Sequence, residues 1–388
     1  MRQALATRLQ EIAPFHVMEL MKMAAELEAE GRHLIHMGIG EPDFTAPPAV
    51  IEAATRAMQD GKLQYTSALG IPALRNALSQ HYLREFGMDV APSRIILTAG
   101  ASGALLLACA ALVEAGSEVL MPDPSYPCNR HFVAAFEGRA KLIASGAEHR
   151  FQLTADMVRA HWGAQTRGVL LASPSNPTGT SILTEELTAI LQEVRVRNGF
   201  TIVDEIYQGL SYDARPSTVL AQTDDVVVIN SFSKYFNMTG WRLGWLVVPE
   251  RLVPTFEKLS QNLFICPSAI AQHAALACFE PQTLAVFEQR KAEFQRRRDY
   301  LVPALRELGF GIPVMPDGAF YIYADCSAMT GDADEFAKRV LREAGVVIVP
   351  GLDFGPYTAK THVRLSYANS LENLQEAVRR LSRFLGRN

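Results

Sequence analysis

VVVINSFSKYFNMTGWRLGWLVVP, residues 226–249, places two apolar runs on either side of a polar stretch that contains Lys234 and Arg242. The runs at 226–231 and 244–249 are short, rich in β-branched residues and bounded by Ser, Gly or Pro, which indicates buried strands. Five further runs of this kind precede them in the chain: 94–99, 118–122, 140–144, 168–173 and 200–205. Helical patterns separate most of these runs. Their alternation predicts an α/β fold with a largely parallel sheet that helices cover on both faces.

The pattern changes after about residue 285, where a long charged helix is predicted at 288–308. Three strand-like runs alternate with helical segments beyond it: 318–325, 345–351 and 362–368. Near the other end, an amphipathic helix at 16–30 precedes a short strand at 33–39. We therefore expect a large domain and a smaller α+β domain built from both ends of the chain. Their limits are 50–285 for the large domain, and 1–49 with 286–388 for the small one.

The composition is that of an ordinary globular protein and excludes several classes. Of the 388 residues, 48% are hydrophobic and 20% charged, and the net charge of −4 argues against a protein that coats nucleic acid or anionic lipid. The five cysteines form no CxxC pair and the histidines lack metal-ligand spacing, so neither a disulfide framework nor a metal is expected. No signal peptide or membrane span is visible. We expect a soluble, cytoplasmic protein.

Polar residues follow several predicted strands, at the sheet edge where doubly wound folds bind ligands. Gly100 opens the stretch GASG, which is expected to precede a helix that starts at about Ala104 and to cradle an anion there, and Asn176 follows the run at 168–173. Asp204 ends another strand, and Lys234 follows the run at 226–231. Each signal alone is weak, because such residues are more often caps or solvated side chains. Together they supply the lysine, the acid and the phosphate cup that pyridoxal phosphate needs.

Six motifs occur in an order that resembles the class I/II aminotransferases of the fold-type-I pyridoxal phosphate family. They are GEPDF (40–44), NPTG (176–179), DEIY (204–207), SFSK (231–234), MTGWRLGW (238–245) and VRLSYA (363–368). The resemblance runs from about residue 14 to the C-terminus. It implies a seven-stranded, mostly parallel sheet and a bound pyridoxal phosphate. It also implies ping-pong transfer of an amino group from an L-amino acid to a 2-oxo acid.

The resemblance assigns roles to individual residues of the cofactor site. Lys234 matches the lysine that holds the cofactor as a Schiff base and then acts as a base beside the substrate Cα. Asp204 matches the carboxylate opposite the pyridine nitrogen, and Tyr207 and Asn176 match the donors to the ring 3-oxygen. Tyr126 matches the aromatic residue that stacks on the ring. The residues that resemble the family's phosphate cup are Gly100, Ala101, Ser102, Ser231 and Arg242.

The resemblance also implies a substrate site and a second subunit. Arg364 matches the arginine that binds the substrate α-carboxylate as a two-point fork, with Gly40 and Asn176 beside the substrate. Tyr65 matches a residue that reaches the phosphate of the neighbouring subunit, and the loop at 261–267 is expected to cross in the same way. A homodimer with shared active sites is therefore expected.

The substrate is predicted from the loop before the first helix. Aspartate-specific relatives resemble one another in small hydroxyl residues there, whereas this chain has Phe15 and Val17. They also carry a lysine beside the phosphate-cup glycine, where this chain has Ala101 and Ser102 after Gly100. A second substrate carboxylate without a donor costs several kcal/mol to bury. We therefore favour a neutral apolar or aromatic amino donor with 2-oxoglutarate or pyruvate as acceptor. Aspartate stays open, because Phe15 can simply seal the pocket while an arginine elsewhere receives the second carboxylate.

Other readings of the same residues are weaker. The same lysine, aspartate and phosphate cup serve a pyridoxal-phosphate C–S β-lyase or a decarboxylase. A non-enzymatic sensor of this fold would need an added DNA-binding domain. SFSK fits the S-x-x-K motif of serine acyl-enzymes, but the SDN and KTG motifs that accompany it are absent from the sequence.

Overall fold

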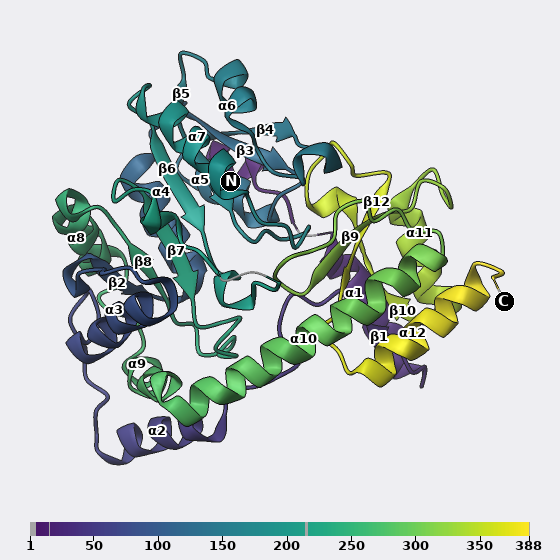
Figure 1. Ribbon diagram of the computed structural model, residues 1–388, viewed down its shortest axis with the longest axis horizontal. Helices are drawn as coiled ribbons and strands as arrows, with labels where there is room; N and C mark the ends of the chain where they lie inside the picture. The colour runs from purple at the N-terminus through teal and green to yellow at the C-terminus, as the bar shows by residue number, and fades with distance from the viewer. Residues whose placement is uncertain (1–4, 15, 214–215, 388) are drawn as a thin grey trace.

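The computed structural model describes residues 5–14, 16–213 and 216–387, and its central element is a seven-stranded sheet (Figure 1). The strand order is β2-β8-β7-β6-β5-β3-β4. β8 runs antiparallel to both of its neighbours, and the other neighbouring pairs are parallel. The strands are β2 (Ile95–Thr98), β3 (Glu118–Asp123), β4 (Arg139–Ala144), β5 (Thr166–Ala172), β6 (Phe200–Asp204), β7 (Val227–Ser231) and β8 (Gly244–Val247). The predicted α/β class is confirmed, and each of the seven predicted runs forms a strand of this sheet.

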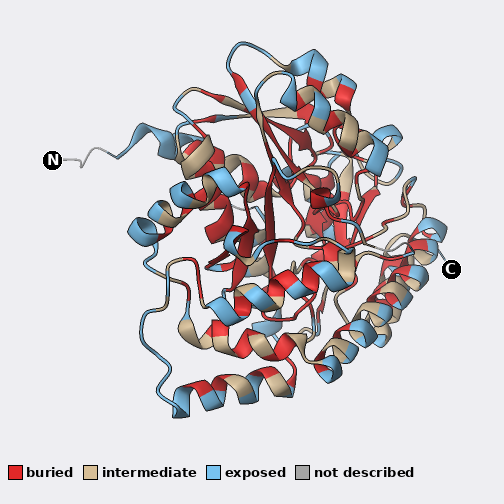
Figure 2. Ribbon diagram, turned by 60° about the vertical axis from the view of Figure 1, so that its left-hand side comes forward, coloured by how far each residue is buried: buried red, intermediate tan, exposed pale blue. Residues whose placement is uncertain are grey.

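Both faces of this sheet are buried, as near-continuous apolar strands require. Successive residues of β7 show this directly, because Val227 and Val228 belong to two separate hydrophobic clusters. α4 (Gly100–Leu112) and α8 (Val253–Leu263) contribute to the cluster of Val227, and α7 (Thr184–Arg195) contributes to that of Val228. Figure 2 shows the strands as a buried centre and the helices as exposed only on their outer faces.

The segments near the two ends of the chain pair with each other beside the large sheet, on the right of Figure 1. β1 (Ile35–His36) pairs in parallel with β10 (Val346–Val347). A second, antiparallel sheet has the order β11-β12-β9, made of β11 (Val349–Pro350), β12 (His362–Ser366) and β9 (Tyr321–Asp325). The part of the fold built from both ends therefore has its own small sheets.

The remaining helices cover the two parts and connect them. They are α1 (Val17–Ala29), α2 (Pro48–Gln59), α3 (Pro72–Phe86), α5 (Pro127–Ala135), α6 (Ala155–His161), α9 (Ala269–Ala275), α10 (Pro281–Glu307), α11 (Ala333–Arg339) and α12 (Leu371–Phe384). α10 runs from beneath the large sheet to the small sheets (Figure 1). The predicted limits at 49/50 and 285/286 fall inside α2 and α10, and the division into domains stays a prediction.

The start of α4 differs from the sequence prediction. The stretch GASG was expected to precede the helix, but α4 begins at Gly100, so Ala101 and Ser102 lie in its first turn. Gly100 has a φ of +72°, a conformation that glycine adopts without steric cost and that lets the chain turn directly from β2 into the helix. The anion-binding character of the stretch therefore comes from a helix N-terminus.

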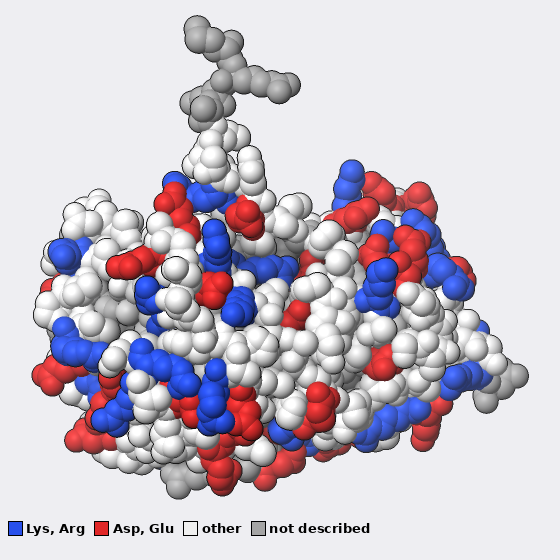
Figure 3. All heavy atoms as spheres, turned by 90° about the horizontal axis from the view of Figure 1, so that it is seen from above, with Lys and Arg blue, Asp and Glu red and all other residues white. Residues whose placement is uncertain are grey.

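Acidic and basic side chains are interspersed over the face of the molecule shown in Figure 3. No helix within the described ranges combines the length and the apolar character that a membrane span needs.

We expect Leu171→Ala in β5 to lower the free energy of unfolding by about 2–5 kcal/mol, because Leu171 is fully buried and its loss leaves a cavity. Urea unfolding at a fixed protein concentration measures this. The matched control is Leu183→Ala, since Leu183 is 56% exposed and its truncation is expected to change stability by less than about 0.5 kcal/mol. Equal losses in the two variants would contradict this account of the core.

Candidate active site

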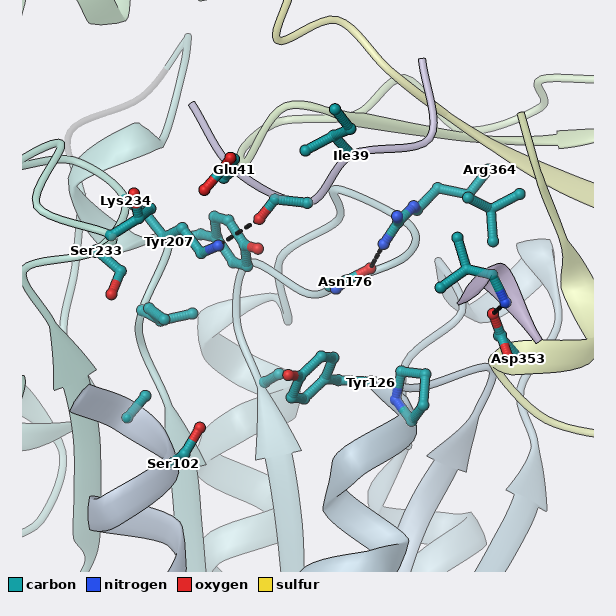
Figure 4. Close-up of a pocket in the computed structure, with 18 of the residues that line it drawn as sticks. Ile39, Glu41, Ser102, Tyr126, Asn176, Tyr207, Ser233, Lys234, Asp353 and Arg364 are labelled. Carbon is teal, nitrogen blue, oxygen red and sulfur yellow. Dashed lines mark hydrogen bonds between the residues drawn. The ribbon is translucent and has the colours of Figure 1, made fainter. Parts of the chain in front are cut away.

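A cavity of about 570 Å³ lies at the carboxyl ends of the parallel strands, where the sequence predicted ligand binding. Asp204 ends β6, Asn176 follows β5 and Lys234 follows β7, and all three line the cavity. Gly40, from the segment after β1, and Arg364, from β12, complete the wall on the other side. Figure 4 shows the labelled side chains of both walls around one space. Residues separated by more than 300 positions in the sequence therefore meet at one site.

The amine of Lys234 is held inside this cavity. Its Nζ donates a hydrogen bond to the backbone oxygen of Gly40 and lies 5.7 and 5.8 Å from the ring centres of Tyr207 and Phe320. Burial and, after it, the positive charge of Arg364 lower the pKa of Lys234 to about 8, while Glu41 opposes the shift. The amine therefore exchanges its proton much closer to neutral pH than an exposed lysine does.

Asp204 is a buried carboxylate that faces the same cavity. Its Oδ1 accepts a hydrogen bond from the backbone N–H of Ile206 at 3.0 Å, and no described side chain hydrogen-bonds to it. Burial raises the pKa of Asp204 to about 6, while the Ile206 N–H and the charge of Lys234 oppose that rise. At pH 7 the group is mostly ionised, so it offers negative charge to a cationic partner in the cavity.

The first turn of α4 and Arg242 form a positively polarised corner of the cavity. Ala101 and Ser102 line it from the helix N-terminus, and Arg242 lines it from the segment before β8. A Cβ built on Gly100 would lie 2.6 Å from Nη2 of Arg242, so only glycine lets the helix start approach the guanidinium this closely. Free backbone N–H groups and a cation on one corner favour an anion such as a phosphate.

Arg364 lies at the other end of the cavity with its guanidinium fixed on several sides. Nη1 donates to Oδ1 of Asn176 at 2.8 Å, and Nη2 donates to the backbone oxygen of Gly38 at 2.7 Å. The guanidinium lies 4.5 Å from the ring centre of Tyr321 and 5.0 Å from that of Phe354. Nε is buried and has no hydrogen-bond partner, so this cation has a donor left for a ligand carboxylate.

The wall nearest the N-terminal segment is apolar. Asp353 fixes that wall by accepting hydrogen bonds from the backbone N–H groups of His16 and Val17 at 2.7 and 2.8 Å, which anchors the start of α1 (Figure 4). The apolar lining residues of this region are Val17, Met18, Met21, Ile39, Val349 and Phe354.

Most of the described residues predicted for the site line this cavity, and three of them do not: Gly100, Ser231 and Tyr65. Tyr126 and Tyr207 line it with those described above, and Gly100 contacts Arg242 just behind the wall. Ser231 is buried behind the wall, where its hydroxyl donates to the backbone oxygen of Leu243. Tyr65 is 81% exposed on the loop between α2 and α3, and Phe15 lies outside the described residues.

Sequence reasoning missed several lining residues. Ser233 and Glu41 stand next to predicted residues and line the cavity, and proximity in the sequence was the available signal. Asp353, Met18 and Met21 carry no motif, because their place depends on contacts between distant segments.

Comparison with known proteins places this geometry in a family. The family model described as aminotransferase class I and II matches residues 32–381. The chain belongs to the class I and II aminotransferases. It is 41% identical to a valine–pyruvate aminotransferase of Mycobacterium tuberculosis, over 96% of this chain and 97% of that protein. It is 34% identical to an aspartate aminotransferase of Geobacillus stearothermophilus, over 98% of both chains.

Solved structures agree with this assignment. A crystal structure of an aminotransferase from Mycobacterium tuberculosis matches with a TM-score of 0.94 at 39% identity and covers 99% of both chains. An aspartate aminotransferase from Thermus thermophilus with maleate matches with a TM-score of 0.92 at 34% identity, over 98% of this chain and 99% of that one. The predicted family, fold type and enzyme class are therefore confirmed: the protein is a pyridoxal-phosphate-dependent aminotransferase.

The residues of the cavity fit this cofactor. Lys234 offers a primary amine for its aldehyde, and Asp204 offers an unpaired buried carboxylate for a protonated pyridine nitrogen. The corner lined by Ala101 and Ser102 at the start of α4 and by Arg242 suits its phosphate. When bound, pyridoxal phosphate supplies a carbonyl that captures the donor's amine and a ring that withdraws electrons from Cα.

We expect the amine of Lys234 to react with formaldehyde and cyanoborohydride with a rate that rises through about pH 8 in the aminotransferase freed of cofactor. Only the neutral amine reacts, and its fraction grows as the pH passes the lowered pKa of Lys234. Peptide mass spectrometry across a pH series measures the methylation. Lys258, exposed on α8, is the comparison in the same sample. A rate for Lys234 that rises only above pH 10 would contradict the effect of burial.

Proposed function

We propose that this aminotransferase takes the amino group of an L-amino acid with a neutral apolar or aromatic side chain and passes it to pyruvate or 2-oxoglutarate by a ping-pong cycle. The apolar wall built by the start of α1, Ile39 and Phe354 carries this proposal. The relative named valine–pyruvate aminotransferase supports it, at 41% identity over nearly the whole chain.

The charges around the cavity support the same substrate class. Among the described lining residues the cations are Lys234, Arg242 and Arg364. Lys234 and Arg242 stand at the cofactor end, and Arg364 is held where it can receive one carboxylate. A second carboxylate on the substrate side chain would be buried against apolar atoms without a donor, which costs several kcal/mol. Pyruvate, like the proposed donor, has a single carboxylate and a small apolar side chain, so it is the favoured acceptor.

We assign the catalytic roles as follows. Lys234 holds the cofactor covalently, and its released amine moves the proton from the substrate Cα. Asp204 keeps the proton on the pyridine nitrogen, and Tyr207 and Asn176 donate hydrogen bonds to the ring 3-oxygen. Arg364 binds the substrate α-carboxylate. The phosphate is held by Gly100, Ala101, Ser102, Ser231 and Arg242, the ring is covered by Tyr126, and the substrate lies against Gly40.

We also propose a homodimer with shared active sites. The loop that carries Tyr65 lies beside the loop that ends at Pro267, because Gln272 donates to both Thr66 Oγ1 and the Pro267 backbone oxygen. Apolar side chains on the two loops are exposed in the single chain: Leu63, Tyr65, Leu263, Phe264 and Ile265. A partner subunit that covers this surface would bring Tyr65 to its own cavity. The cytoplasmic location stays a prediction from the sequence.

We expect Asp204→Asn to retain pyridoxal phosphate but to lower kcat by about 10²–10³, since a neutral amide no longer holds a proton on the ring nitrogen. Absorbance gives the cofactor content, and stopped-flow half-reactions with a saturating donor give the rate. Glu205→Gln is the neighbouring control, because Glu205 is buried and hydrogen-bonded to Thr218 and Val219 away from the cavity lining. A turnover number for Asp204→Asn near that of the wild type would remove Asp204 from catalysis.

We expect valine, leucine and phenylalanine to reduce the bound cofactor in single turnovers at least about tenfold faster per molar than aspartate, because a second carboxylate finds no donor. A panel of twenty amino acids measures these rate constants. Val17→Thr, which adds a hydroxyl at nearly constant volume, is expected to raise the ratio of aspartate to valine. The converse order, with aspartate fastest in the wild type, would overturn the proposed substrate class while leaving the aminotransferase activity in place.

A further inference from the structure

Tyr321 lies directly behind the cavity and contacts residues that belong to both halves of the site. It begins β9, in the part of the fold built from the chain ends, and its side chain is fully buried. Its Oη lies 2.8 Å from Oη of Tyr207, which comes from the segment after β6. The two rings meet edge to face, with centres 5.6 Å apart at an angle of 81°. Tyr321, which does not line the cavity, thus contacts the phenol of Tyr207, which does.

Either hydroxyl can donate to the other, and a ligand oxygen in the cavity decides between the two directions. Both are buried, and burial raises the pKa of each above its usual value, so each keeps its proton. Within the described residues, Tyr207 is the only hydrogen-bond partner of Tyr321 Oη. If Tyr207 donated, the proton of Tyr321 would be buried without an acceptor, which costs about 1–3 kcal/mol. When an oxygen of the bound cofactor accepts the proton of Tyr207, Tyr321 therefore donates to Tyr207.

The ring of Tyr321 contacts the substrate end of the site. The Arg364 guanidinium lies 4.5 Å from its centre, within the range of a cation–π contact. This stacking complements the hydrogen bonds from Arg364 to Asn176 and Gly38, which act at the edge of the guanidinium. Gly40 closes the arrangement, since a Cβ built on it would lie 3.2 Å from Oη of Tyr321.

We propose that Tyr321 is a positioning residue with two separable actions: its hydroxyl orients the O–H of Tyr207 toward the cofactor's 3-oxygen, and its ring holds the guanidinium of Arg364 in the plane that receives the substrate carboxylate. This inference rests on the roles proposed above for Tyr207 and Arg364. A donated hydrogen bond makes Tyr207 a stronger donor in turn, because bonds in a chain polarise one another. The side chain of Tyr321 thereby orients Tyr207 at the cofactor end of the cavity and Arg364 at the substrate end.

The test uses two variants of the holoenzyme that remove the two actions one at a time. Tyr321→Phe deletes the hydroxyl and keeps the ring, and Tyr321→Leu deletes both. The first readout is the pH at which the absorbance of the bound cofactor titrates. The second is the Kd of 3-methylbutanoate, an unreactive monocarboxylate, measured by calorimetry. If Tyr321 only stabilised the fold, the variants would lower the melting temperature. They would not change the titration pH in one variant and both the titration pH and the Kd in the other.

In Tyr321→Phe we expect the titration to move up by about 0.5–1 pH unit, the equivalent of one neutral hydrogen bond, with Kd within twofold of the wild type. In Tyr321→Leu we expect the same upward move and a Kd weakened by about 5- to 30-fold. Because Tyr321→Phe hardly changes the volume, it remains decisive for the hydroxyl if Tyr321→Leu fails to fold. Tyr321→Met then tests the ring.

Two reference variants separate this inference from the proposed function. Tyr207→Phe is expected to raise the titration at least as far, and Tyr321→Phe added to it should have no further effect. Arg364→Lys is expected to weaken 3-methylbutanoate binding. If these references change neither readout, the proposed roles of Tyr207 and Arg364 are wrong. If they behave as expected while Tyr321→Phe titrates like the wild type, or Tyr321→Leu keeps the wild-type Kd, the positioning role of Tyr321 is overturned.

Discussion

The guanidinium of Arg364 joins three parts of the chain that the sequence keeps far apart. It donates to Asn176, which follows a strand of the large sheet, and to the backbone of Gly38 near the N-terminus. It also lies within 5.0 Å of the ring centres of Tyr321 and Phe354, both from the C-terminal part. Burying a cation without hydrogen bonds is costly, so these contacts hold the segments around it. The buried Nε has no partner, and a ligand carboxylate can reduce the cost of burying this group.

The site residues at the ends of the large sheet's strands could be predicted because the sequence pattern shows where each strand ends. Apolar runs located every strand, and the polarity of the next few residues then pointed to Asn176, Asp204 and Lys234. Burial explains why these positions are useful: it raises the pKa of Asp204 and lowers that of Lys234. The start of α4 was placed too late because a glycine followed by small residues reads as a loop, although Gly100 opens the helix.

The remaining part of the site depends on contacts that no local pattern encodes. Tyr321 occurs in the strand-like run at 318–325, which predicts a strand but does not say which face meets another segment. The role of Asp353 as anchor of the α1 start requires the backbone of residues more than 300 positions away. Tyr65 shows a different limit, since a single chain leaves it on the surface.

The two walls of the cavity carry different tasks. The strand-end wall holds the amine, the carboxylate and the anion corner on a sheet that is buried on both faces and therefore resists change. The opposite wall near the N-terminus is the first turn of α1, anchored by backbone N–H groups donating to Asp353, and so it needs no particular side chain at Val17 or Met18 to stay in place. Substitutions there can alter the preferred substrate without disturbing the cofactor end.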